Sequence, residues 1–209
     1  MTIPALFATS SGGRLMARNT FFNGCKIDEG FETDYKQAGS QFKDSVRKPV
    51  VVVDSDSINH NRFEENVMKK MALKGNDVWF MTHIEYVEDI FDSFNTVAEY
   101  VLAPLHSVIN KNELKEIISV SDSVIPSVFV INGNALGIEG ERGDLFSVLD
   151  SVIDCGYCRT CIVDTDSSVP GEIWEELYDE HPATLPFVSN DNEKVFFGDF
   201  RNIIKPADF

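Results

Sequence analysis

The stretch PVVVVD, residues 49–54, decides the fold class of this chain, because it is apolar and β-branched almost throughout. A strand of that composition is buried on both faces, as in parallel sheets that are covered by helices. The apolar side chains of Phe63, Val67 and Met71 follow at helical spacing, and Gly75 is a typical helix end. The stretch therefore predicts one strand–helix unit of an α/β protein.

The same alternation of strand and helix continues on both sides of this unit. The predicted strands are 3–7, 49–54, 78–83, 99–107, 127–131, 161–164, 185–188 and 195–197. Further helices are predicted around 33–45, over 87–94, after an N-cap at Asn110, over 145–152 and over 170–178. Eight parallel strands joined by right-handed helical crossovers close into a barrel. We therefore predict a compact (βα)8 barrel of the TIM type, a single domain over 1–209, with a long loop after strand one.

Composition narrows the classes of partner. The formal net charge is −16, from 34 acidic and 18 basic residues, and such a surface repels nucleic acid and anionic membranes. The sequence shows no basic leader and no apolar run approaching the roughly 18 residues that span a bilayer. The expected location is therefore the cytoplasm, and the expected partner is a small-molecule ligand.

Polar residues with catalytic chemistry follow the predicted strands, at the barrel end where enzymes of this architecture place their active sites. The candidate catalytic residues are Asp54, His83, His106 and Asp164, and the candidate ligand-binding residues are Asp56, Glu85, Asn132, Asp166 and Ser189. Two carboxylate pairs and two histidines at one mouth could exchange protons or bind a divalent metal ion. The same residue types also cap helices and accept hydrogen bonds from loop amides, so both interpretations stay open. No particular metal ion or cofactor is predicted.

One short motif offers an alternative chemistry. Asp54-Ser-Asp56 after an apolar strand resembles the first motif of haloacid-dehalogenase-type phosphatases, in which the first Asp attacks phosphorus and the second acts as the acid. That family also needs a downstream lysine, and none is well placed before Asp164.

The cysteines offer a further alternative chemistry, an iron–sulfur site. Cys155, Cys158 and Cys161 show two consecutive C-x-x-C spacings, which with Cys25 would suit an iron–sulfur site. In the predicted barrel the three lie toward the amino-terminal face, whereas Cys25 follows strand one at the opposite face. We therefore expect free thiols.

The order of the strand-end motifs resembles the barrel family of the histidine-biosynthesis phosphoribosyl isomerase, especially its uncharacterised archaeal relatives. MTIPALF (1–7) looks like the first strand of that family, and VVVDSDSI (51–58) like the second with its Asp-x-Asp pair. IVDTDSSVPG (162–171) looks like the sixth strand with its loop, and Asn132-Gly133 like a turn after strand five. The resemblance implies a barrel that binds a small metabolite at its carboxyl-end mouth.

The chain departs from that family at the residues that carry the chemistry. The isomerase uses a carboxylate at the end of strand one and another on strand five, where this chain has Phe7 and Phe129. Phenylalanine cannot exchange a proton, so the acid/base pair is absent. The glycine-rich phosphate cradle after strand seven is replaced by 189–191, Ser-Asn-Asp, with Gly198 as a remnant. A relative with lost or changed chemistry is therefore expected, and whether it is an enzyme stays open.

Two other functions are compatible with the sequence. One is a metal-dependent hydrolase or phosphatase that uses Asp54, His83, His106 and Asp164. The other is a non-catalytic barrel whose face or Phe-rich first loop binds a protein partner. Phe21, Phe22 and Phe31 in that loop could form a lid, an interaction surface or a cover over one end of the core.

Overall fold

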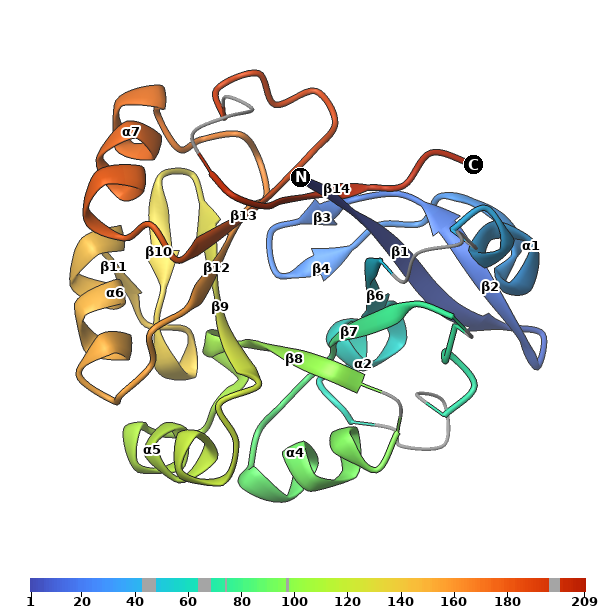
Figure 1. Ribbon diagram of the computed structural model, residues 1–209, viewed down its shortest axis with the longest axis horizontal. Helices are drawn as coiled ribbons and strands as arrows, with labels where there is room; N and C mark the ends of the chain where they lie inside the picture. Colours follow the sequence, from blue (N-terminus) through green and yellow to red (C-terminus); the bar gives the residue numbers. More distant parts are fainter. Residues whose placement is uncertain (43–47, 64–68, 74, 97, 196–199) are drawn as a thin grey trace.

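The structure is a computed structural model and describes residues 1–42, 48–63, 69–73, 75–96, 98–195 and 200–209. Its centre is a closed barrel of eight parallel strands with helices on the outside (Figure 1). In order around the ring the strands are β1 (Thr2–Ser11), β6 (Pro49–Asp54), β7 (Asp77–Met81), β8 (Ala98–Pro104), β9 (Val124–Ile131), β12 (Thr160–Asp164), β13 (Thr184–Val188) and β14 (Ile203–Pro206). Pairing of β14 with β1 closes the ring, so the barrel has no free edge. The predicted α/β barrel is confirmed at this level.

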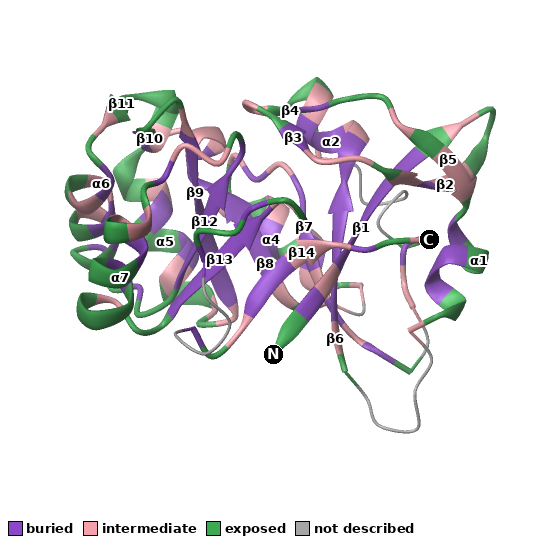
Figure 2. Ribbon diagram, turned by 90° about the horizontal axis from the view of Figure 1, so that it is seen from above, coloured by how far each residue is buried: buried purple, intermediate pink, exposed green. Residues whose placement is uncertain are grey.

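Most of the described α-helices lie outside the ring of strands, whereas the helix that follows β6 lies at the carboxyl end of the strands (Figure 2). They are α1 (Tyr35–Ser40), α2 (Ser55–His60), α4 (Val87–Phe94), α5 (Lys111–Val120), α6 (Leu145–Ile153) and α7 (Gly171–Glu180), with short 3₁₀ helices η1 (Leu105–Ser107) and η2 (Ile138–Gly140). The Asn110 side chain accepts a hydrogen bond from the Glu113 amide at 2.9 Å, as the predicted N-cap requires. No helix separates β13 from β14 among the described residues, so a complete (βα)8 alternation is not seen. None of the described helices is long and apolar enough to cross a membrane.

One predicted strand is wrong, and one predicted helix lies partly outside the described residues. The eighth strand is β14, not 195–197; of that stretch only Val195 is described, and it lies in a bend. The helix expected from the apolar spacing at Phe63, Val67 and Met71 has its centre, 64–68, outside the described residues, and a helix that was not predicted, α2, starts directly after β6. Phe63 and Met71 lie outside any helix, and Val67 lies outside the described residues.

The predicted long loop after strand one is largely made of strands. β1 runs on to Ser11 and turns at Gly12 and Gly13, both with positive φ, into β2 (Arg14–Asn19), which then pairs with β5 (Phe31–Asp34). Between β2 and β5 a small hairpin, β3 (Phe22–Asn23) with β4 (Lys26–Ile27), projects over the barrel in Figure 1. α1 falls inside the predicted helix 33–45, of which 43–47 lie outside the described residues.

The apolar core has an inner and an outer part, because successive side chains of a strand point to opposite faces. Inside the barrel lie side chains such as Phe7, Val53, Phe129 and Phe187, all at 1% exposure or less. The outer part packs the helices against the strands and is buried as well (Figure 2). A second hairpin extends β9 through Asn132 and Gly133, both with positive φ, into β10 (Asn134–Leu136) and β11 (Arg142–Gly143).

Candidate functional site

The carboxyl ends of the eight strands meet at one end of the barrel, which we call the mouth. Asp54 and Asp164 are the last residues of β6 and β12, and His83 and His106 each stand two residues after the end of β7 and of β8. The sequence therefore predicts correctly that these side chains lie at the same end. β6, β7 and β8 are neighbours, but β12 is four strands from β6 in either direction around the ring. Asp164 thus lies across the mouth from Asp54, whereas only β9 separates its strand from β8, which His106 follows.

Aromatic rings fill the space between the two sides. Phe22 of the β3–β4 hairpin is 4% exposed, and its ring centroid lies 5.3 Å from that of Phe7, 5.0 Å from Phe129 and 5.5 Å from Phe187. Phe21 lies beside it, with its centroid 5.7 Å from that of Phe187. We call these five rings the aromatic cover. The hairpin that supplies Phe21 and Phe22 lies over the carboxyl end in Figure 2.

The aromatic cover fills the centre of the mouth with side chains that cannot exchange a proton. Phe7 and Phe129 come from opposite strands, β1 and β9, and Phe22 lies against both. These rings offer no proton donor or acceptor, so the mouth has no acid/base pair at these positions. Phe31 is 75% exposed and takes no part in the cover.

A single side chain of α2 fixes the hairpin to the barrel. Asn59 Oδ1 accepts from the Ile27 amide at 2.8 Å, and Asn59 Nδ2 donates to the Ile27 carbonyl at 2.9 Å. Lys26 Nζ donates to the Asn59 carbonyl at 3.1 Å. Asn59 therefore supplies the polar attachment of the hairpin, while Phe22 supplies its apolar anchor.

Replacing Asn59 with alanine is expected to lower the free energy of unfolding by about 1–2 kcal/mol, because two hydrogen bonds to the partly buried Ile27 backbone are lost. The matched control is Asn23→Ala, which removes one exposed hydrogen bond to Asp28 on the same hairpin. That change should cost less than about 0.5 kcal/mol. Equal effects of the two variants in urea unfolding would show that Asn59 does not hold the hairpin.

The first carboxylate pair is used to hold local structure. Asp54, buried at 1% exposure, caps α2 by accepting from the Ser57 amide at 3.1 Å. Asp56 accepts from Thr9 Oγ1 at 2.7 Å and from the Ser10 amide at 2.6 Å, which ties α2 to β1. These are the capping and loop-binding roles that carboxylates at strand ends commonly take.

The second pair organises the opposite side of the mouth. Asp164 is fully buried and accepts from the Ser168 amide at 2.9 Å and from Asn192 Nδ2 at 3.1 Å. Burial raises its pKa to about 6, against the opposing effect of the loop amides. Asp166 accepts from the Asn132 amide at 2.7 Å. Burial favours a higher pKa for Asp166, but hydrogen bonds from Ser168 and Asn132 outweigh it and lower the pKa.

The loop after β13 braces the buried carboxylate. The Ser189 carbonyl accepts from the Asn192 amide at 3.2 Å, and Asn192 in turn donates to Asp164. Ser189, predicted as a ligand-binding residue, therefore lies at the mouth in a loop that supports Asp164.

The raised pKa of Asp164 gives a pH effect of known sign. The folded state binds the proton more tightly than the unfolded chain, so Asp164 destabilises the protein as pH rises from 3.8 to about 6. We expect this contribution to reach about 2 kcal/mol after solvent screening. Urea unfolding across that range should show the loss for the natural chain and not for Asp164→Asn. The same pH slope in both proteins would contradict the assignment.

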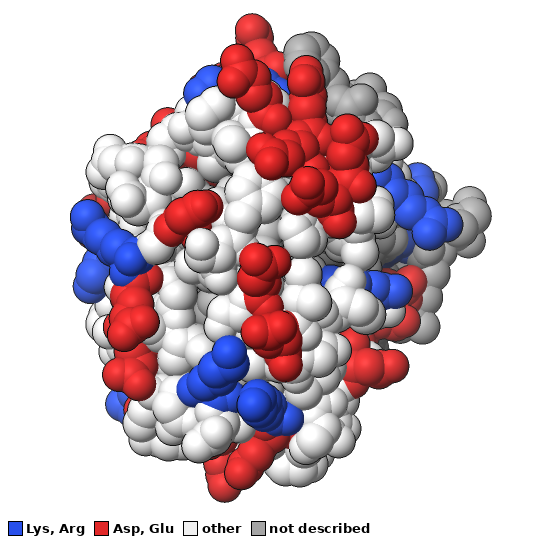
Figure 3. All heavy atoms as spheres, turned by 90° about the vertical axis from the view of Figure 1, so that its left-hand side faces the viewer, with Lys and Arg blue, Asp and Glu red and all other residues white. Residues whose placement is uncertain are grey.

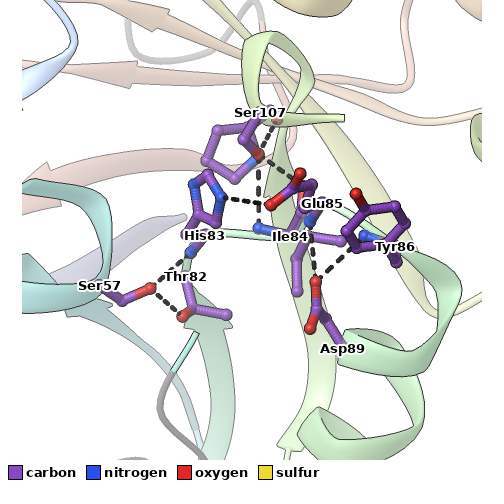
Figure 4. Close-up of polar contacts among 9 residues, drawn as sticks. Ser57, Thr82, His83, Ile84, Glu85, Tyr86, Asp89 and Ser107 are labelled. Atoms are coloured by element: carbon purple, nitrogen blue, oxygen red, sulfur yellow. Dashed lines mark hydrogen bonds and ion pairs between the residues drawn. The ribbon is translucent and has the colours of Figure 1, made fainter. Parts of the chain in front are cut away.

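His83 and Glu85 stand on the other side of the mouth, after β7 (Figure 4). The His83 amide donates to Ser57 Oγ at 2.8 Å, and Ser57 Oγ lies 2.8 Å from Thr82 Oγ1. His83 Nε2 lies 3.8 Å from Glu85 Oε2. Burial lowers the pKa of His83, and the charges of Glu85 and Asp89 oppose that shift.

The turn that carries these residues is braced from two sides, as Figure 4 shows. Ser107 Oγ donates to the Ile84 carbonyl at 2.7 Å, which joins the end of β7 to η1. Asp89 Oδ2 accepts from the amides of Glu85 and Tyr86 at 2.9 and 3.1 Å. The side chains of His83 and Glu85 are therefore presented from a well-supported turn.

His106 carries a buried polar atom that no described residue satisfies. Its ring lies 4.8 Å from that of Phe129, centroid to centroid, and its Nδ1 is buried without a hydrogen-bond partner among the described residues. Burial, helped by the nearby His83, lowers its pKa to about 4. At neutral pH His106 is thus an uncharged imidazole beside the aromatic cover.

The cysteines do not meet. Cys25 lies in the β3–β4 turn at the mouth, whereas Cys155 and Cys158 precede β12 and Cys161 lies inside the barrel. All four are free thiols, and burial raises the pKa of Cys161 to about 12. Among the residues that the structure describes, no group of three or more His, Cys, Asp or Glu side chains could hold a metal ion.

No family model and no curated protein matches this chain. The function is therefore argued from the geometry of the mouth.

Proposed function

We propose that the chain binds a small uncharged polar molecule at the mouth of its barrel, beside His106, with the β3–β4 hairpin as a movable cover. The observation that carries this proposal is the buried Nδ1 of His106, which lacks a partner among the described residues. An unsatisfied buried polar atom costs about 1–3 kcal/mol, and a hydrogen-bonding group of a ligand would remove that cost. A site of this kind joins apolar walls to a few placed polar groups.

The charges of the mouth define the chemical class of the ligand. His106 is neutral because its pKa is about 4, so it offers a hydrogen bond and no positive charge. Asp56, Glu85 and Asp166 place carboxyl groups around the mouth, and they repel a phosphate. Hydroxyl or amide groups beside an apolar part fit the histidine and the rings best.

The distant relationship to the phosphoribosyl isomerase and the full (βα)8 assignment belong to the same proposal. The closed ring with strands in sequential order supports them. In this interpretation the barrel has kept a binding mouth and exchanged the acid/base pair for apolar contacts.

The proposal is tested by thermal unfolding in the presence of a panel of uncharged metabolites, including sugars, nucleosides and amides. A ligand at a hundred times its Kd raises the stability by about 2.7 kcal/mol. The stabilisation should disappear in His106→Phe, which keeps an aromatic ring but no nitrogen, and persist in the control His60→Ala. Ligands that stabilise His106→Phe equally would place their site elsewhere, and a panel without any hit would contradict the proposal.

A second candidate function is a non-catalytic barrel that binds a protein partner. The close packing of Phe22 against three rings of the barrel favours it, because a permanent plug would leave no room for a ligand. The two candidates differ in whether the hairpin opens while the barrel stays folded.

The hydrolase alternative gains no support from the mouth. Asp54 and Asp164 lie on opposite strands of the ring, and both hold local structure.

A further inference from the structure

A cavity of about 450 Å³ lies at the amino-terminal end of the barrel, opposite the mouth, and its volume suits a small ligand. Its walls include Trp79 near the start of β7 and Leu185 near the start of β13. Arg159, just before β12, and Arg201, just before β14, line it as well. We call it the basal cavity.

The guanidinium of Arg159 is held by an aromatic residue beside this cavity, Tyr100. Arg159 Nη1 donates to Tyr100 Oη at 3.1 Å, and the guanidinium carbon lies 5.5 Å from the Tyr100 ring centroid. The Tyr100 ring in turn meets Trp79 edge to face, with centroids 4.9 Å apart. A cation is thereby fixed next to a large aromatic surface.

The charge of the basal cavity is opposite to that of the protein. The chain has a net charge of −16, and acidic side chains gather on the face shown in Figure 3, where α7 carries Glu175, Glu176 and Asp179. The described residues that line the basal cavity include Arg159 and Arg201 but no carboxylate. Neither arginine forms an ion pair with another described residue.

Thr184 and Asn202 add uncharged hydrogen-bonding groups to the same walls. Two arginines without carboxylate partners are suited to an anion, since guanidinium groups pair with carboxylate and phosphate in a planar, two-bond geometry. Trp79 supplies an indole face or edge for a planar ring.

We propose that the basal cavity binds a small molecule that joins an aromatic ring to an anionic group, such as a nucleotide or an aromatic carboxylate. The anion pairs with Arg159 and Arg201, and the ring packs on Trp79. This site lies at the other end of the barrel from the mouth and does not depend on the function proposed there.

The test is a fluorescence titration that uses Trp79 as the reporter. The chain has two tryptophans, and the other, Trp174, is 2% exposed on the buried side of α7, so a ligand in the basal cavity acts on Trp79. The probes are AMP, benzoate, adenosine and inorganic phosphate. We expect saturable quenching by AMP or benzoate, with adenosine and phosphate at least about tenfold weaker because each lacks one half of the recognised chemistry.

Substitutions assign the effect to the cavity. Arg159→Gln and Arg201→Gln should each weaken binding of the anionic probe by about tenfold or more, because one charge-assisted pair is lost. Arg142→Gln removes the same charge at the mouth end and should leave the affinity unchanged. The proposal is overturned if neither AMP nor benzoate saturates, or if all three variants bind alike.

Discussion

Replacing Phe22 with alanine is expected to lower the free energy of unfolding by about 3–5 kcal/mol, the largest effect of any substitution considered for this chain. Phe22 is 4% exposed and lies within 5.5 Å, centroid to centroid, of Phe7, Phe129 and Phe187. Its removal leaves a cavity at the centre of the mouth and exposes the inner core. Urea unfolding followed by far-UV circular dichroism measures the change.

Phe31→Ala is the matched control, because Phe31 belongs to the same segment but is 75% exposed. It should change the free energy of unfolding by no more than about 0.5 kcal/mol. If Phe22→Ala cost as little as the control, the aromatic cover would not close the mouth. The loss of stability in Phe22→Ala cannot exceed the free energy needed to open the hairpin. Once the hairpin is open, Phe22 makes no contacts with the barrel, so its replacement costs nothing more.

The second large effect is a loss of stability in acid through His106. Its pKa is about 4 in the folded protein and 6.5 in the reference state, so the unfolded chain binds its proton more tightly. The contribution of neutral His106 is therefore complete above pH 6.5 and is lost as pH falls toward about 4. We expect it to amount to about 3 kcal/mol, and the lowered pKa of His83 acts in the same direction.

Comparison with His106→Phe isolates this effect from general acid unfolding. As pH falls from 6.5 to about 4, the natural chain should lose more of its free energy of unfolding than His106→Phe does, because only the natural chain has an imidazole to protonate at this position. NMR titration of the His106 ring gives the pKa directly. A value of 6 or above would show that the imidazole is solvated and would remove the reason to place a ligand beside it.

The barrel could be predicted from the sequence because local signals agreed with the final fold. PVVVVD is continuously β-branched, and it became β6, buried along almost its whole length. Asn110 and Glu113 marked the start of α5, and the spacing over 87–94 marked α4. In each case the pattern depends on neighbours within a few residues.

The eighth strand could not be predicted in the same way. Residues 203–206, Ile-Ile-Lys-Pro, contain a proline and a lysine, whereas Val-Phe-Phe at 195–197 has the stronger β propensity. β14 is a strand because it fits between β13 and β1, residues far from it in the chain. Tertiary pairing here overrides local preference.

The strand-end residues of the mouth could be predicted, but their grouping was mistaken. Parallel strands bring Asp54 and Asp164 to one end, and this was expected. Strands two and six of an eight-stranded ring are opposite each other, however, so the sequence order already contained the separation of these two carboxylates. The attachment of Asn59 to Ile27 joins residues 32 apart, and no local pattern predicts such a contact.

The measurement that tests the central claim most directly is native-state hydrogen exchange at the Ile27 amide, which Asn59 Oδ1 binds at 2.8 Å. A movable cover predicts that this amide exchanges through a local opening, several kcal/mol below the global free energy that protects the amides of β12, and that a bound ligand slows it. Exchange of Ile27 only with global unfolding would show a permanent plug, and it would contradict a ligand site beneath the hairpin.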